Sequence, residues 1–76
     1  MKKKSNVGRT KLLSKIEMEI IDIFKERGIS RDDMLGFTSV LDIKKAHNEM
    51  LQWLKDNPNA RYDEILNKIT EIYEQD

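Results

Sequence analysis

Apolar residues recur at helical spacing through the middle of the chain, over residues 39–56. On a helical wheel most of these positions fall on one side, with Asp42 and Glu49 among the polar residues opposite. The clustered positions are Val40, Ile43, His47, Met50, Leu51 and Leu54. This arc covers nearly half of the circumference, so we expect the helix to contact two neighbouring helices. Leu41 lies outside the arc and Trp53 lies at its edge.

A second helical pattern covers residues 11–27 and ends at Gly28, because glycine is common just beyond the last turn of a helix. Its main apolar stripe consists of Leu12, Leu13, Ile16, Ile20, Ile23 and Phe24. Ser14 and Glu17 have the spacing of a capping box, which favours a later start. The leucines at 12 and 13 favour a start near residue 11, which we adopt.

Two further segments have helical character. Residues 60–74 carry the most regular amphipathic pattern of the chain, and Asn57-Pro58 separates them from the central segment. Residues 31–36 follow Ser30, a good N-cap, but Gly36 weakens them, so a short helix is expected there. The pattern therefore predicts an all-α fold in which three main helices and one short helix form a single domain over residues 10–76.

Charge changes this picture at the start of the chain. Residues 1–11 carry five basic and no acidic side chains, whereas residues 62–76 carry five acidic side chains and one lysine. We interpret residues 1–9 as a disordered basic tail. An alternative is an arm that binds nucleic-acid phosphates through Lys2, Lys3, Lys4, Arg9 and Lys11. The basic start is not followed by an apolar stretch, so no secretory signal or membrane span is expected, and a cytoplasmic location is predicted.

The sequence contains no pattern that is typical of catalysis or of cofactor binding. The chain has no cysteine and one histidine, His47, so neither a thiolate metal site nor a cluster of histidine ligands can form. The glycines are isolated, and neither a nucleophile elbow nor a calcium loop occurs. We therefore predict a protein that is not an enzyme, with no cofactor, no metal and no small-molecule substrate. His47 is expected at the edge of the core, and its role stays open.

The remaining candidates are apolar side chains that a minimal helical bundle does not need. Met18 and Ile21 lie off the stripe of the first helix, and with Leu41 and Trp53 they form our candidate contact residues for another protein or for a second copy of the chain. The predicted function is that of a non-catalytic protein-binding or regulatory module. Two alternatives are a nucleic-acid-binding regulator that uses the basic arm, with or without a helix-turn-helix, and a small acidic inhibitor of a nucleic-acid-processing protein.

Overall fold

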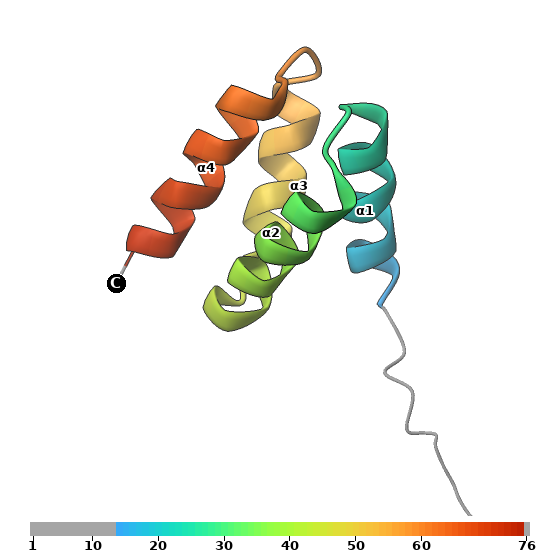
Figure 1. Cartoon of the computed structure of the whole chain (residues 1–76). Coiled ribbons are helices and arrows are strands. Elements are labelled where there is room, and N and C mark those ends of the chain that lie inside the picture. Colours follow the sequence, from blue (N-terminus) through green and yellow to red (C-terminus); the bar gives the residue numbers. More distant parts are fainter. Residues whose placement is uncertain (1–13, 76) are drawn as a thin grey trace, which may run out of the picture.

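The computed structural model describes residues 14–75, which form four helices and no strand. The helices are α1 (Lys15–Glu26), α2 (Arg31–Lys44), α3 (His47–Asp56) and α4 (Tyr62–Glu74). Successive helices run in opposite directions, and α2 crosses in front of α3 between α1 and α4 (Figure 1). The predicted all-α class is confirmed. Within residues 14–75, no helix is both long and apolar enough to cross a membrane.

The core lies where two pairs of helices meet. α1 packs mainly against α3, and α2 packs mainly against α4. Aromatic contacts join the pairs, because the rings of Phe24 and Phe37 meet edge to face with their centroids 5.8 Å apart. The fully buried large side chains are Phe24, Ile20, Leu41, Met50, Leu54, Ile65 and Ile72. Burial of these side chains, at roughly 25 cal/mol per Å² of apolar surface, is the main force that holds the four helices together.

The ends of α1 follow local capping chemistry. Ser14 has extended backbone angles, its hydroxyl accepts a hydrogen bond from the Glu17 N–H, and the Glu17 carboxylate accepts one from the Ser14 N–H. The helix therefore begins at Lys15, as the capping box indicates, and not near residue 11. Gly28 takes a φ of 80°, and the Ile29 N–H donates to the Phe24 carbonyl, which completes the predicted glycine stop.

The main correction concerns the boundary between the second and third helices. α2 does not stop near Gly36 but continues to Lys44, for 14 residues in all, and the predicted uninterrupted helix over 39–56 is broken at Lys45. Lys45 takes the left-handed conformation with a φ of 55°, and the Ala46 N–H donates to the Leu41 carbonyl. Burial of Phe37 and Leu41, one turn apart on α2, outweighs the roughly 1 kcal/mol that glycine costs inside a helix.

The break at Lys45 changes which side chains of residues 39–56 reach the core. Leu41, predicted to lie outside the apolar arc, is fully buried, whereas Ile43, predicted inside it, is 70% exposed. The predicted arc merged positions of α2 with positions of α3, although the two helices point in opposite directions. On a wheel drawn for α2 alone, Phe37 and Leu41 mark the buried face, and Ile43 lies on the face exposed to solvent.

α3 and α4 are joined by a short turn, and the side chain of Arg27, the residue just after α1, forms hydrogen bonds with it. The α3 helix ends at Asp56 as predicted, and α4 begins at Tyr62, two residues later than expected. The Arg61 N–H donates to the Glu64 carboxylate, which caps the first turn of α4. The Arg27 guanidinium donates to the carbonyls of Leu54, Asn57 and Ala60, at 3.0 to 3.1 Å. Arg27 thus ties the end of α1 to the end of α3.

Candidate protein-binding groove

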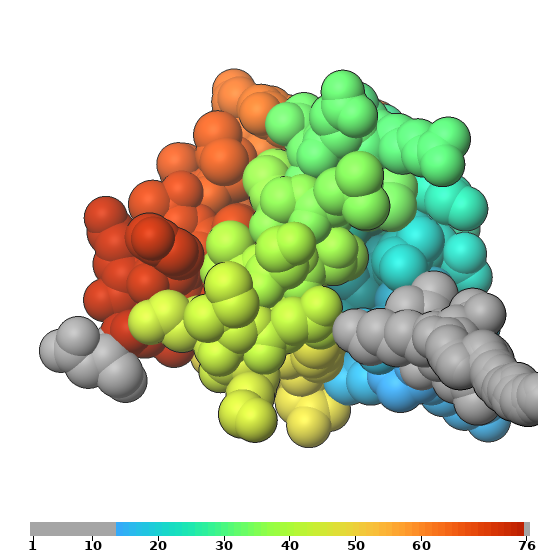
Figure 2. Space-filling view, turned by 60° about the horizontal axis from the view of Figure 1, so that its bottom comes forward, coloured from blue at the N-terminus to red at the C-terminus, as the bar shows by residue number. Residues whose placement is uncertain are grey.

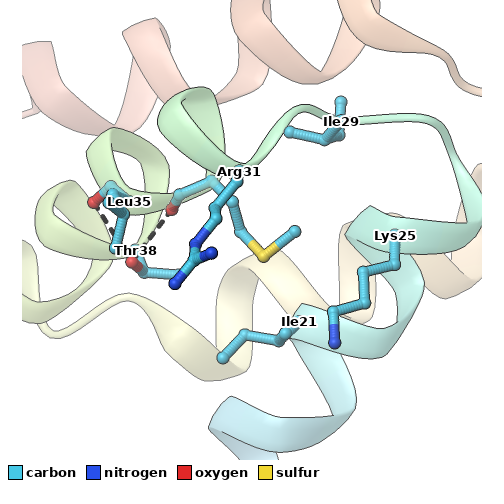
Figure 3. Close-up of a pocket in the computed structure, with 7 residues that line it drawn as sticks. Ile21, Lys25, Ile29, Arg31, Leu35 and Thr38 are labelled. Carbon is cyan, nitrogen blue, oxygen red and sulfur yellow. Dashed lines mark hydrogen bonds between the residues drawn. The ribbon is translucent and has the colours of Figure 1, made fainter.

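A groove with a volume of about 530 Å³ runs between α1 and α2. It is lined by Ile21, Lys25, Ile29, Arg31, Met34, Leu35 and Thr38. Figure 3 shows Ile21 and Lys25 on α1, Arg31, Leu35 and Thr38 on α2, and Ile29 on the connecting segment. The groove exists because α1 and α2 each pack on a different helix, so they stand apart where their outer faces meet.

Helical spacing brings the lining residues onto matching faces. Ile21 and Lys25 lie one turn apart on α1, and Met18 lies one turn before them. On α2, Arg31 and Leu35 are likewise one turn apart. The Thr38 hydroxyl is turned back onto the helix, because it donates to the carbonyls of Met34 and Leu35. The polar group of Thr38 is therefore satisfied, and its methyl group adds to the apolar lining of the groove.

Two cationic groups line this apolar groove from opposite sides. Lys25 belongs to α1 and Arg31 to α2, and both side chains extend toward the space between the helices (Figure 3). Neither forms an ion pair or a side-chain hydrogen bond with any residue of the range 14–75, and no acidic residue lines the groove. A molecule that fills the groove therefore meets apolar side chains flanked by two positive charges that have no partner within residues 14–75.

The structure brings only some of the predicted contact residues to this surface. Ile21 lines the groove, and Met18 on the same face of α1 is 47% exposed. Leu41 is fully buried in the core and is therefore closed to a partner. Leu35, which sequence reasoning missed, is 63% exposed at the groove. Its spacing of four residues from Arg31 was a usable signal, but residues 31–36 were expected to form only a short helix.

Trp53 occupies a different surface, between α3 and α4. It is half-buried against the core and borders a shallow cavity of about 240 Å³ with Glu64, Asn67, Lys68 and Glu71. Lys68 donates to Glu49 at 3.0 Å and to Glu71 at 3.2 Å. Burial alone lowers the pKa of Lys68, but these carboxylates outweigh it, so the pKa lies above its ordinary value. Hydrogen bonds from Gln75 and from Lys68 lower the pKa of Glu49. Charges here are paired, unlike those at the groove.

α2 is the most prominent helix on the side of the molecule that Figure 2 shows, where it lies between α4 and α1.

The basic residues proposed for nucleic-acid binding, Lys2, Lys3, Lys4, Arg9 and Lys11, lie outside the described residues, and so do Leu12 and Leu13 of the predicted stripe. The candidate surface is therefore the groove, whose residues all belong to α1, α2 and the segment that connects them.

His47 gains neighbours that its position in the sequence does not suggest. Its Nε2 atom lies 3.1 Å from Asp42 Oδ1 and 3.7 Å from Glu17 Oε2. The three residues come from the last turn of α2, the first turn of α1 and the first position of α3. Nε2 is buried and makes no hydrogen bond with the described residues, although Asp42 lies within ion-pair distance.

Comparisons with protein-family models, with curated proteins and with solved structures find no match to this chain.

Proposed function

We propose that this chain is a non-catalytic protein-binding module, and that the groove between α1 and α2 binds an amphipathic helical segment that carries carboxylates beside its apolar face. The observation that supports this most strongly is the combination of an apolar lining with Lys25 and Arg31, two cations that have no partner among the described residues.

The geometry suits a helical ligand better than an extended one. An amphipathic helix presents apolar side chains at intervals of three, four and seven residues, which two flanking helices can receive in one groove. An extended strand would need free backbone groups at the edge of a sheet, and residues 14–75 form no strand. Exposed Met18, on the same face of α1, enlarges the apolar surface beyond the groove lining itself.

Charge decides which amphipathic helices can bind. A ligand with acidic residues along its apolar face places them beside Lys25 and Arg31, and this attraction chiefly improves specificity and association rate. A ligand with basic residues at the same positions meets like charges. Selectivity between an acidic and a basic version of one helix is therefore the signature that this proposal requires.

Selection from a displayed library of helical peptides tests the proposal. The full chain is the target, and the Leu35→Glu variant is the counter-target, because it places a carboxylate on an exposed position of the groove. We expect the enriched peptides to combine apolar residues at helical spacing with Asp or Glu beside them. A synthetic enriched peptide should bind at least about tenfold more tightly than its Lys-substituted counterpart, a difference of about 1.4 kcal/mol.

Ile43→Glu is the matched control, since Ile43 is 70% exposed on α2 and does not line the groove. This variant should bind the enriched peptide as the parent chain does. Enrichment of peptides that Leu35→Glu retains equally well, or a preference for basic peptides, would refute the groove as the binding site.

A further inference from the structure

We infer that Glu17, Asp42 and His47 form a binding site for a divalent transition-metal ion of the Zn²⁺ type. The three side chains offer one imidazole nitrogen and two carboxylate oxygens, all within 4.8 Å of one another. Imidazole and carboxylate together suit zinc and its first-row neighbours, whereas calcium and magnesium prefer oxygen ligands alone.

The distances between the ligand atoms fit such an ion. In a tetrahedral zinc site, metal–ligand bonds of about 2.0–2.2 Å place adjacent ligand atoms roughly 3.3–3.6 Å apart. Nε2 of His47 lies 3.1 Å from the Asp42 oxygen and 3.7 Å from the Glu17 oxygen. The two carboxylate oxygens lie within 4.8 Å of each other, so side-chain rotations that bring them closer would place an ion between the three atoms. Three protein ligands leave at least one coordination position for water.

The imidazole supplies an independent reason to expect a ligand. Nε2 of His47 is buried and lacks a hydrogen-bond partner among the described residues, and a polar atom left in that state costs about 1–3 kcal/mol. The nitrogen faces two carboxylates, so a positive ion held by those carboxylates would also satisfy Nε2. The ion takes the lone pair of Nε2, which requires a neutral His47 that carries its proton on Nδ1.

Capping of α1 already orients one of the carboxylates. The backbone N–H and the hydroxyl of Ser14 both donate to Oε1 of Glu17, each at 3.2 Å. The other oxygen of this carboxylate is the one that lies toward His47. Hydrogen bonds that hold a ligand in place are typical of metal sites.

The test is a titration of the full, metal-stripped and ¹⁵N-labelled chain with ZnCl₂. His47 is the only histidine of the chain, so its two ring nitrogens give signals that need no assignment by mutation. We expect saturation at one ion per chain and a shift of the Nε2 signal that far exceeds the shift of Nδ1. Zn²⁺ should also raise the melting temperature, because the unfolded chain does not bring the three ligands together.

Variants locate the ion on these three side chains. His47→Gln and Asp42→Asn should each weaken Zn²⁺ binding by about 100-fold or more, because loss even of an outer-shell partner costs 10–100-fold. Glu19→Gln is the control, since Glu19 is a carboxylate of α1 that pairs with Lys55 instead. It should leave Zn²⁺ binding unchanged.

Two results would overturn the site. One is an Nε2 signal that Zn²⁺ leaves in place up to millimolar concentration, which would mean that the cluster does not bind the ion. The other is binding of Zn²⁺ with no shift at Nε2, which would place the ion elsewhere on the chain. Both results come from the parent protein, so they decide the matter even where a variant fails to fold.

Discussion

Arg27 supplies hydrogen-bond donors for one carbonyl in the last turn of α3, that of Leu54, and for two carbonyls of the turn that follows, those of Asn57 and Ala60. The last four carbonyls of a helix have no partner within the helix. The guanidinium of Arg27 donates to the carbonyls of Leu54, Asn57 and Ala60, and it brings a positive charge to the negative end of the α3 dipole. Because the side chain is half-buried, water competes poorly for these bonds.

We expect Arg27→Met to lower the free energy of unfolding by about 2–3 kcal/mol, since hydrogen bonds to a charged group contribute roughly 1.5–3 kcal/mol each and are not additive. Methionine retains most of the apolar stem. Arg27→Lys should recover only part of the loss, because an ammonium cannot reproduce the planar fork of donors. Urea denaturation at neutral pH measures both changes.

Arg31→Met is the control for this experiment. Arg31 is exposed and makes no hydrogen bond to a carbonyl within the described range, so the change should stay within about 0.5 kcal/mol. Equal effects at the two positions would show that Arg27 acts through its general charge and not through the carbonyls that it contacts.

Single residues also show where sequence reasoning succeeds. The glycine stop at Gly28 and the capping box at Ser14 depend on local geometry, which spacing along the chain reveals directly. The hydrogen bonds of Arg27 join residues about thirty positions apart in the sequence. They depend on how α1 and α3 pack, so no local sequence pattern could predict them. The groove cations Lys25 and Arg31 were missed for the same reason.

At the scale of elements, the position of one break decides much of the fold. A helix continuing from Asp42 to His47 would place these residues about 140° apart, on different faces. The left-handed turn at Lys45 instead folds the start of α3 back toward the end of α2, so Asp42 and His47 become neighbours. Sequence reasoning placed the break at Gly36, and it therefore could not predict this cluster or the burial of Leu41.

Two residues of this region, Gly36 and Lys45, are not the types that their backbone conformations favour. Gly36 is exposed within α2, and a Cβ there meets nothing within 4 Å. Lys45 is exposed in a left-handed conformation that favours glycine. We expect Gly36→Ala to stabilise the chain by about 0.5–1 kcal/mol, and Lys45→Gly to stabilise it by up to about 1 kcal/mol.

Denaturant midpoints measure both substitutions, and circular dichroism reports helix content. Lys45→Val is the contrasting variant, because a β-branched side chain resists a positive φ. It should destabilise the chain. A loss of stability in Gly36→Ala would show that the helix does not continue through residue 36, and it would favour the short helix that the sequence pattern predicts.

At the scale of the whole molecule, pairing of α1 with α3 and of α2 with α4 buries one apolar face of each helix and leaves the groove between α1 and α2. The all-α class follows from the period of the apolar residues and was predictable. The groove was not, because its residues lie on the outer faces of two helices whose separation depends on packing. Only Met18 and Ile21, which are off the main stripe of α1, pointed to this surface.

Salt distinguishes a foreign acidic partner from self-association through the same surface. A twofold contact of two grooves would bring Lys25 and Arg31 of both copies to one interface, where like charges repel. Screening by salt relieves this repulsion, so such a dimer should strengthen as salt rises. An acidic peptide in the groove should respond in the opposite way, because screening weakens its attraction to the same two cations.

We therefore expect the full chain to sediment as a monomer at low salt, and the enriched acidic peptide to lose about tenfold in affinity as salt rises to the molar range, where the screening length falls to about 3 Å. Analytical ultracentrifugation and peptide titration measure the two quantities in the same buffers. Arg31→Gln should flatten the salt dependence of peptide binding, while Lys55→Gln, which removes a cation paired with Glu19, should leave it unchanged. A dimer that forms at low salt and dissociates as salt rises would contradict this account, because Lys25 and Arg31 would then face carboxylates of a second copy.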